Sequence, residues 1–119
     1  MKIAVTSTGS ELDSEVDPRF GRALFILIVD SKTLAFEVAD NKDNVEALKG
    51  AGIQAASMIS EKGADVLLTG HCGPNAIKAL NAADIGVANN ASGTVRDAVK
   101  AYLAGKLPLT KEADVEGQW

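Results

Sequence analysis

The sequence predicts one α/β domain whose elements follow the order β-β-β-α-β-α-β-α. A length of 119 residues suits a single domain with a hydrophobic core. Short apolar runs typical of strands come first, and in the second half of the chain they alternate with apolar residues at helical spacing. Turns rich in glycine or asparagine separate them. The second half is therefore expected to form right-handed βα units on a parallel sheet.

Three strands are expected in the first third of the chain. Ile3–Val5 is a short buried strand, and Leu24–Val29 is almost wholly apolar. The turn at Asp30–Lys32 joins the latter to the alternating segment Leu34–Val38, which gives a hairpin. The polar segment Thr6–Arg22 is long for a connection in a compact domain, and such loops often carry function.

The helical half follows a polar loop at Asp40–Lys49. Apolar stripes predict three helices, which are Ala51–Ile59 with an end at Gly63, Ala76–Ala83, and Val95–Leu103 with an end at Gly105. Two more strands are expected between them, at Val66–Leu68 and Ile85–Ala88. Since the end of the chain shows no core periodicity, we expect one domain over residues 1–107 and a flexible C-terminal tail over residues 108–119.

Composition narrows the classes of partner. A net charge of −4 without a basic stripe argues against nucleic-acid binding, and 4% aromatic residues leave few stacking surfaces. No run of about 18 apolar residues is present that would span a membrane. A single cysteine cannot form an internal disulfide and fits a reducing compartment. We expect a cytoplasmic protein with neither nucleic-acid nor membrane partners.

The loop Gly70–Asn75 holds the only histidine and the only cysteine of the chain, side by side between a strand and a helix. Pro74 suits the first position of a helix, and Gly73 allows a sharp turn before it. His71 and Cys72 are therefore expected at a helix N-terminus, exposed to a ligand. Unpaired N–H groups and the helix dipole favour negative charge there, so the site predicts an anionic ligand or a metal–sulfur species.

Several loops are expected to meet at one edge of the sheet, because ligands of open α/β sheets bind beyond the carboxyl ends of the strands. These loops are Thr6–Arg22, Gly70–Asn75 and Asn89–Gly93. The stretch Gly50–Gly52 before the first helix lacks a capping side chain, which leaves its amides open to a ligand. Arg19 and Arg22 would add positive charge.

Three motifs carry a resemblance to a known family. Val16–Ala23 resembles the hydrophobic, x, Pro, x, Phe-Gly-Arg signature of the dinitrogenase iron–molybdenum cofactor biosynthesis family, while Gly50–Ala56 and Thr69–Ala76 resemble the starts of its first two helices. The match runs from Met1 to about Leu107. The resemblance implies a ribonuclease-H-like fold with a five-stranded mixed sheet, whose second strand is antiparallel, and with three helices. It also implies that the chain binds, carries or helps assemble a metal–sulfur cluster.

Within that family, Met1–Gly9 together with Asp17–Ala23 is similar to the orange proteins of sulfate-reducing bacteria. These small members hold a molybdenum–copper sulfide cluster without covalent attachment. The resemblance therefore implies non-catalytic binding of such a cluster, with a protein partner that stays unknown. Iron–molybdenum and iron–sulfur species are less favoured, because a thiolate-ligated iron–sulfur cluster takes about four cysteines and this chain has one.

The expected cluster-binding residues come from the converging loops. They are Arg19, Phe20, Gly21, Arg22, Gly52, Ile53, Gly70, His71, Cys72, Gly73, Asn75, Asn90 and Gly93. Cys72 and His71 are the candidate metal ligands, since thiolate and imidazole suit copper, although adjacent residues rarely bind the same ion. A small buried apolar residue is the competing interpretation of Cys72.

A cysteine-dependent enzyme acting on a small anion through Cys72 and His71 is the alternative function. The pair resembles the start of the phosphatase loop His-Cys-x-x-Gly-x-x-Arg, but Asn75 and Lys78 replace its glycine and arginine. Losing the arginine fork disfavours phosphoryl chemistry. A metal-dependent nuclease is excluded because the first strand carries no carboxylate. A nucleotide-binding module is excluded because the chain has no phosphate-loop or dinucleotide fingerprint.

Overall fold

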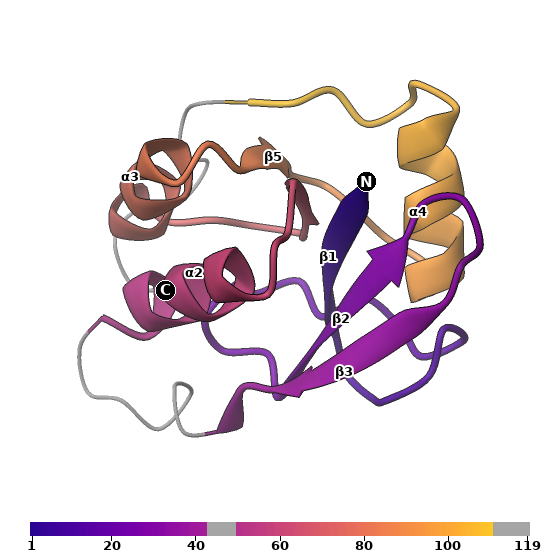
Figure 1. Ribbon diagram of the computed structural model, residues 1–119, viewed down its shortest axis with the longest axis horizontal. Coiled ribbons are helices and arrows are strands. Elements are labelled where there is room, and N and C mark those ends of the chain that lie inside the picture. Colours follow the sequence, from indigo (N-terminus) through magenta and orange to yellow (C-terminus); the bar gives the residue numbers. More distant parts are fainter. Residues whose placement is uncertain (43–49, 111–119) are drawn as a thin grey trace.

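Strand β1 (Lys2–Ser7) lies near the centre of a five-stranded sheet in the computed structural model, which describes residues 1–42 and 50–110 (Figure 1). The strand order is β3-β2-β1-β4-β5. The other elements are β2 (Phe25–Asp30), β3 (Phe36–Asp40), α2 (Ala51–Glu61), β4 (Val66–Leu68), α3 (Pro74–Ala82), β5 (Gly86–Ala88) and α4 (Val95–Leu103). Most of the predicted loop at Asp40–Lys49 lies outside the described residues.

The direction of the strands confirms the predicted mixed sheet. β1 pairs antiparallel with β2 and parallel with β4, while β2 pairs antiparallel with β3 and β4 parallel with β5. Only β2 therefore runs against the others among the described strands. This order and these directions are those of the expected ribonuclease-H-like fold.

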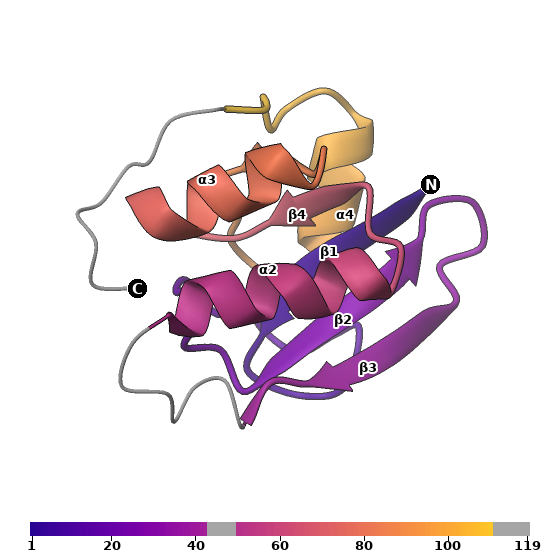
Figure 2. The ribbon, with the colours of Figure 1, turned by 60° about the vertical axis from the view of Figure 1, so that its left-hand side comes forward.

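Two apolar layers cover the sheet, because alternate side chains of each strand point to opposite faces. Ala4 and Leu67 belong to the cluster formed with α2 and α3, whereas Val5 and Leu68 belong to the cluster formed with α4. Figure 2 shows α2 and α3 side by side in front of the sheet, with α4 behind it. None of the helices in residues 1–42 and 50–110 is long and apolar enough to cross a membrane.

The start of α4 is closed by a reciprocal cap. The Asp97 backbone N–H donates to Thr94 Oγ1 at 3.0 Å, and the Thr94 backbone N–H donates to the Asp97 carboxylate at 3.2 Å. The preceding two N–H groups of the helix, at Val95 and Arg96, donate to the carbonyls of Ser14 and Leu12. The first turn of α4 therefore has its donors occupied by the protein itself.

The first residues of the predicted tail are attached to the sheet. The Thr110 N–H donates to the Val87 carbonyl at 2.7 Å, which extends the pairing beyond β5. Leu109 packs on Gly86, where an added Cβ would lie 2.9 Å from a Leu109 methyl carbon. Residues 111–119 of the predicted tail lie outside the described residues.

The cap of α4 makes part of the stability depend on pH. The donated backbone N–H of Thr94 holds the pKa of Asp97 below its ordinary value of 3.8. A lowered folded-state pKa contributes stability that is present above the ordinary value and is lost as the pH falls through the folded value. Asp97→Asn should therefore unfold more easily than wild type at pH 7, with a difference that shrinks below pH 4. Urea unfolding followed by circular dichroism measures the free energy of unfolding of the two proteins at each pH. A difference between them that does not depend on pH would contradict the cap.

Candidate functional site

The segment Pro18–Arg22 lies against the loop that follows β4. The His71 N–H donates to the Pro18 carbonyl at 2.7 Å, and the Phe20 N–H donates to the His71 carbonyl at 3.2 Å. Arg19 and His71 thus face each other as a parallel bridge pair. Two motifs that are distant in sequence are joined here by backbone hydrogen bonds.

Two glycines allow the backbones in this region to approach closely. A Cβ on Gly70 would lie 2.6 Å from Pro18 Cα, and one on Gly21 would lie 2.9 Å from the backbone nitrogen of Gly52. Gly21 also has a φ of +92°, which other residues rarely adopt. These contacts bring together all three sequence motifs, including the start of α2.

The third predicted loop meets the first two at the same edge. The Asn90 N–H donates to the Gly70 carbonyl at 2.9 Å, and the Val16 N–H donates to the Gly93 carbonyl at 2.9 Å. The predicted convergence of the three loops is confirmed. We call this edge, formed by residues 18–22, 50–53, 70–75 and 89–93, the rim.

Two helices begin at the rim without a side-chain cap. α2 starts after Gly50 and α3 starts after Gly73, and neither glycine has a side chain that could accept from the first turn. Figure 2 shows that both helices begin at the same end of the molecule, on its left. Their first-turn N–H groups, together with the positive ends of their dipoles, favour an anion.

The arginines of the rim are placed differently. The Arg19 side chain is 49% exposed, and its Nε lies 3.6 Å from Asp17 Oδ1. Asp17 is itself buried and also accepts the Arg19 backbone N–H at 3.0 Å, so it fixes the turn as well as balancing charge. Arg22 is partly exposed, and its backbone N–H donates to the backbone carbonyl of Arg19.

The expectation that Cys72 is exposed at the rim is wrong. The residue is 0% exposed and lies in the apolar cluster under α3 together with Phe20, which is also 0% exposed. The bridge between Arg19 and His71 explains both positions, because neighbours of a bridge pair point to the opposite side. Neither the thiol nor the Phe20 ring can touch a ligand at the surface in this conformation.

The remaining predicted residues divide by exposure. Those at the surface are Arg19, Ile53, Asn75, Asn90 and Gly93, with Arg22 and His71 partly exposed. Gly21, Gly52, Gly70 and Gly73 are buried, and they contribute backbone rather than surface. Within the described part of the chain, no group of three or more His, Cys, Asp or Glu side chains could hold a metal ion.

Asn89 is the residue at the rim that sequence reasoning missed. It is 9% exposed, and its Oδ1 has no hydrogen-bond partner among the described residues. The sequence did contain a signal, because alternation along the strand after the buried Val87 turns residue 89 inward and residue 90 outward. Asn90 is exposed, with a φ of +66°.

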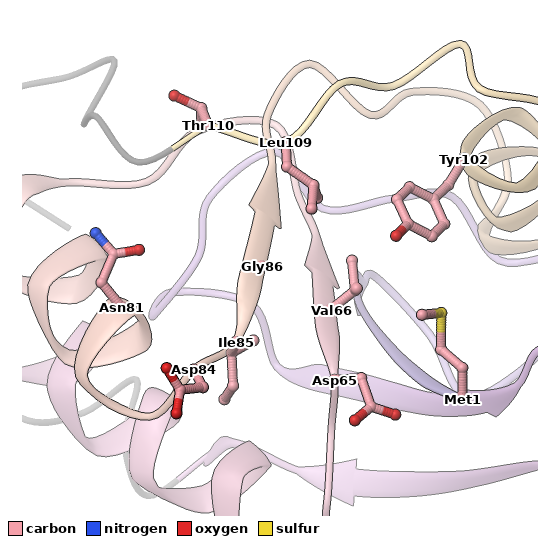
Figure 3. Close-up of a pocket in the computed structure, with 10 residues that line it drawn as sticks. All are labelled: Met1, Asp65, Val66, Asn81, Asp84, Ile85, Gly86, Tyr102, Leu109 and Thr110. Atoms are coloured by element: carbon pink, nitrogen blue, oxygen red, sulfur yellow. The ribbon is translucent and has the colours of Figure 1, made fainter.

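A separate hollow of about 530 Å³ lies at the opposite edge of the sheet. Figure 3 shows Met1, Tyr102 and Leu109 pointing toward one another across it. Its other lining residues are Asp65, Val66, Asn81, Asp84, Ile85, Gly86 and Thr110. None of the predicted cluster-binding residues lines this hollow.

The fold is that of a small α/β domain with a ribonuclease-H-like sheet, and three loops and two helix starts meet at one edge of it. Residues 1–105 match the model of the dinitrogenase iron-molybdenum cofactor family. The chain belongs to this family, as its motifs predicted. A search of the curated proteins finds no match.

Solved structures agree with this assignment. The chain is 45% identical to the orange protein from Desulfovibrio gigas, solved in its apo form, with a TM-score of 0.94 and 96% of each chain covered. It is 31% identical to a Thermotoga protein described as a NifB protein of the DUF35 family, with a TM-score of 0.83 and 98% of each chain covered. The family and the orange protein together indicate a role in binding a metal-containing cofactor.

The close approach at Gly21 can be measured against a matched glycine. Gly105→Ala meets nothing within 4 Å but has a φ of +78°, so it reports backbone strain alone. That strain costs about 1–2 kcal/mol. Gly21→Ala has a comparable φ and also collides with Gly52, so we expect a further loss of about 1–3 kcal/mol from overpacking. Equal losses in urea unfolding would contradict the packing of the rim.

Proposed function

We propose that the protein binds or carries an anionic metal–sulfur cluster at the rim, without catalysis, and that a molybdenum–copper sulfide cluster is the ligand. The observation that carries this proposal is the pair of helix N-termini without side-chain caps, held together by the glycine contacts of the Pro18–Arg22 segment. The similarity to the orange protein supports the choice of cluster.

Each group of the rim suits a soft, bulky polyanion in a different way. N–H groups of the first turns of α2 and α3 would donate to sulfide atoms, and the aligned helix dipoles would favour the negative charge. Arg19 and Arg22 would supply charge-assisted hydrogen bonds. Ile53, which is 44% exposed in the first turn of α2, offers an apolar contact beside these donors.

His71 is the better placed of the two candidate metal ligands. It is partly exposed beside Arg19, whereas Cys72 is enclosed below. A single imidazole could bind copper within a cluster that the amides and guanidinium groups hold. Such a site retains the cluster mainly by non-covalent contacts.

The burial of Cys72 argues against the alternative enzyme. A nucleophilic thiol must be reached by its substrate, and this one is 0% exposed beneath the first turn of α3. The cysteine therefore serves packing, which is the usual role of a buried thiol. A cysteine variant therefore distinguishes the two functions, because it would abolish the enzyme's activity but leave cluster binding in place.

Cys72→Ala is expected to leave cluster uptake unchanged while lowering the free energy of unfolding by about 1–2 kcal/mol, because it removes buried volume from the core. Uptake is measured anaerobically with tetrathiomolybdate and a copper(I) salt, as colour and metal retained after desalting. If the variant folds but takes up less than half of the wild-type amount, Cys72 contributes to cluster binding and its purely structural role is wrong.

Arg19→Ala is expected to weaken uptake roughly three- to tenfold, less than a fully buried charged hydrogen bond would, because the side chain is half exposed. Lys32→Ala is the matched control. It removes the same charge from the turn between β2 and β3, where Ser31 bonds to Met1 at the edge opposite the rim. Equal losses in both variants would mean that overall charge, not the rim, attracts the anion.

A further inference from the structure

A row of buried polar side chains lies directly under the rim. Ala4, Leu67 and Val87 face α2 and α3, and the residue two positions after each of them therefore faces the same side. Those residues are Thr6, Thr69 and Asn89, which are 0%, 0% and 9% exposed. They lie at the carboxyl ends of β1, β4 and β5.

The first two members of the row satisfy each other. The hydroxyls of Thr6 and Thr69 lie 2.9 Å apart, and Thr6 Oγ1 donates to the Asp17 carbonyl at 2.6 Å. These bonds attach the Pro18–Arg22 segment to the sheet through the residue that precedes it. Both hydroxyl groups therefore have hydrogen-bond partners within the protein.

Asn89 differs from its neighbours because its Oδ1 is buried and has no hydrogen-bond partner in the described part of the chain. Leaving a buried amide oxygen unpaired is unfavourable, because the oxygen has lost its hydrogen bonds to water without gaining others. Such a group in a folded protein calls for an explanation, and a missing ligand is one.

The topology places Asn89 beside the start of α3. The chain leaves α3 through a short turn at Ala83–Ile85 and enters β5, so helix and strand run in opposite directions and pack together. The residue after the end of β5 is therefore level with the first turn of the helix. That first turn follows Gly73, which provides no side-chain cap.

We infer that Asn89 is a ligand-contacting residue of the rim, whose side-chain amide donates to a sulfide atom of the anion seated at the first turn of α3. This inference rests on the proposed function and adds a residue to its site. The amide oxygen and nitrogen have nearly the same size, so a half turn about the Cβ–Cγ bond exchanges them. Among the described residues, Oδ1 is the buried and unpaired atom of this amide. On binding, the half turn would bring the NH₂ group toward the anion.

This role requires asparagine rather than a residue of similar shape. Leucine fills the same space without a donor, and aspartate has the same outline but, when ionised, only accepts. Asn81 serves as the control position, because its side chain is exposed at the far end of α3, away from the rim.

Three variants test the inference through uptake of the coloured species formed from tetrathiomolybdate and a copper(I) salt. Asn89→Leu should bind about ten- to a hundredfold more weakly, the value of one hydrogen bond to a charged group. It should unfold no more easily than wild type, since a buried unpaired oxygen is removed. Asn89→Asp should bind more weakly still because its charge repels the anion, and Asn81→Leu should bind as wild type does.

A second measurement needs no variant. In nitrogen-15 spectra of the wild-type protein, the side-chain NH₂ signals of Asn89 should shift on adding the same mixture, while those of the exposed Asn81 at the far end of α3 stay in place. Wild-type protein that takes up no coloured species would refute the proposed function. Wild-type binding with undiminished affinity in Asn89→Leu, or with unmoved Asn89 signals, would overturn this inference alone.

Discussion

The contact of Gly21 with the first turn of α2 is the constraint on which the rest of the rim depends. A side chain at this position would lie 2.9 Å from the Gly52 nitrogen, so the two backbones can meet only without one. Gly70 repeats the arrangement against Pro18 on the other side of the same segment. The long loop between β1 and β2 is thereby fixed between two helix starts, and its arginines are brought to the edge of the sheet.

The three helix N-termini at this edge differ in how their first-turn N–H groups are capped. α4 has a reciprocal cap and two further N–H groups bonded to the long loop, so it anchors that loop. α2 and α3 start at glycines without side-chain caps. The two starts that face the rim have no side-chain cap, whereas the third is capped within the protein. A start without a side-chain cap leaves room for a ligand at the first turn.

Apolar periodicity and glycine turns allowed the order of elements and the meeting of the loops to be predicted from the sequence. The antiparallel second strand was implied by the family resemblance. The sequence did not reveal which side chains of the rim are exposed. Arg19 and Phe20, like His71 and Cys72, take opposite orientations because of a bridge between two distant segments. No local pattern specifies that pairing, so the burial of Cys72 cannot be predicted from the sequence. The inward direction of Asn89, in contrast, follows from alternation after Val87. The adjacent His71 and Cys72 also suggest a shared site in the sequence, but packing buries Cys72 and leaves only His71 partly exposed.

The most direct test of the rim as an anion site is a backbone amide titration of the wild-type protein with tetrathiomolybdate and copper(I). The largest shifts should fall on the first-turn amides of α2 and α3 and on residues 19–22. The amides of Val95–Asp97, already bonded within the protein, should move little. Shifts centred on the hollow around Tyr102 and Leu109, or spread evenly over the surface, would contradict the account.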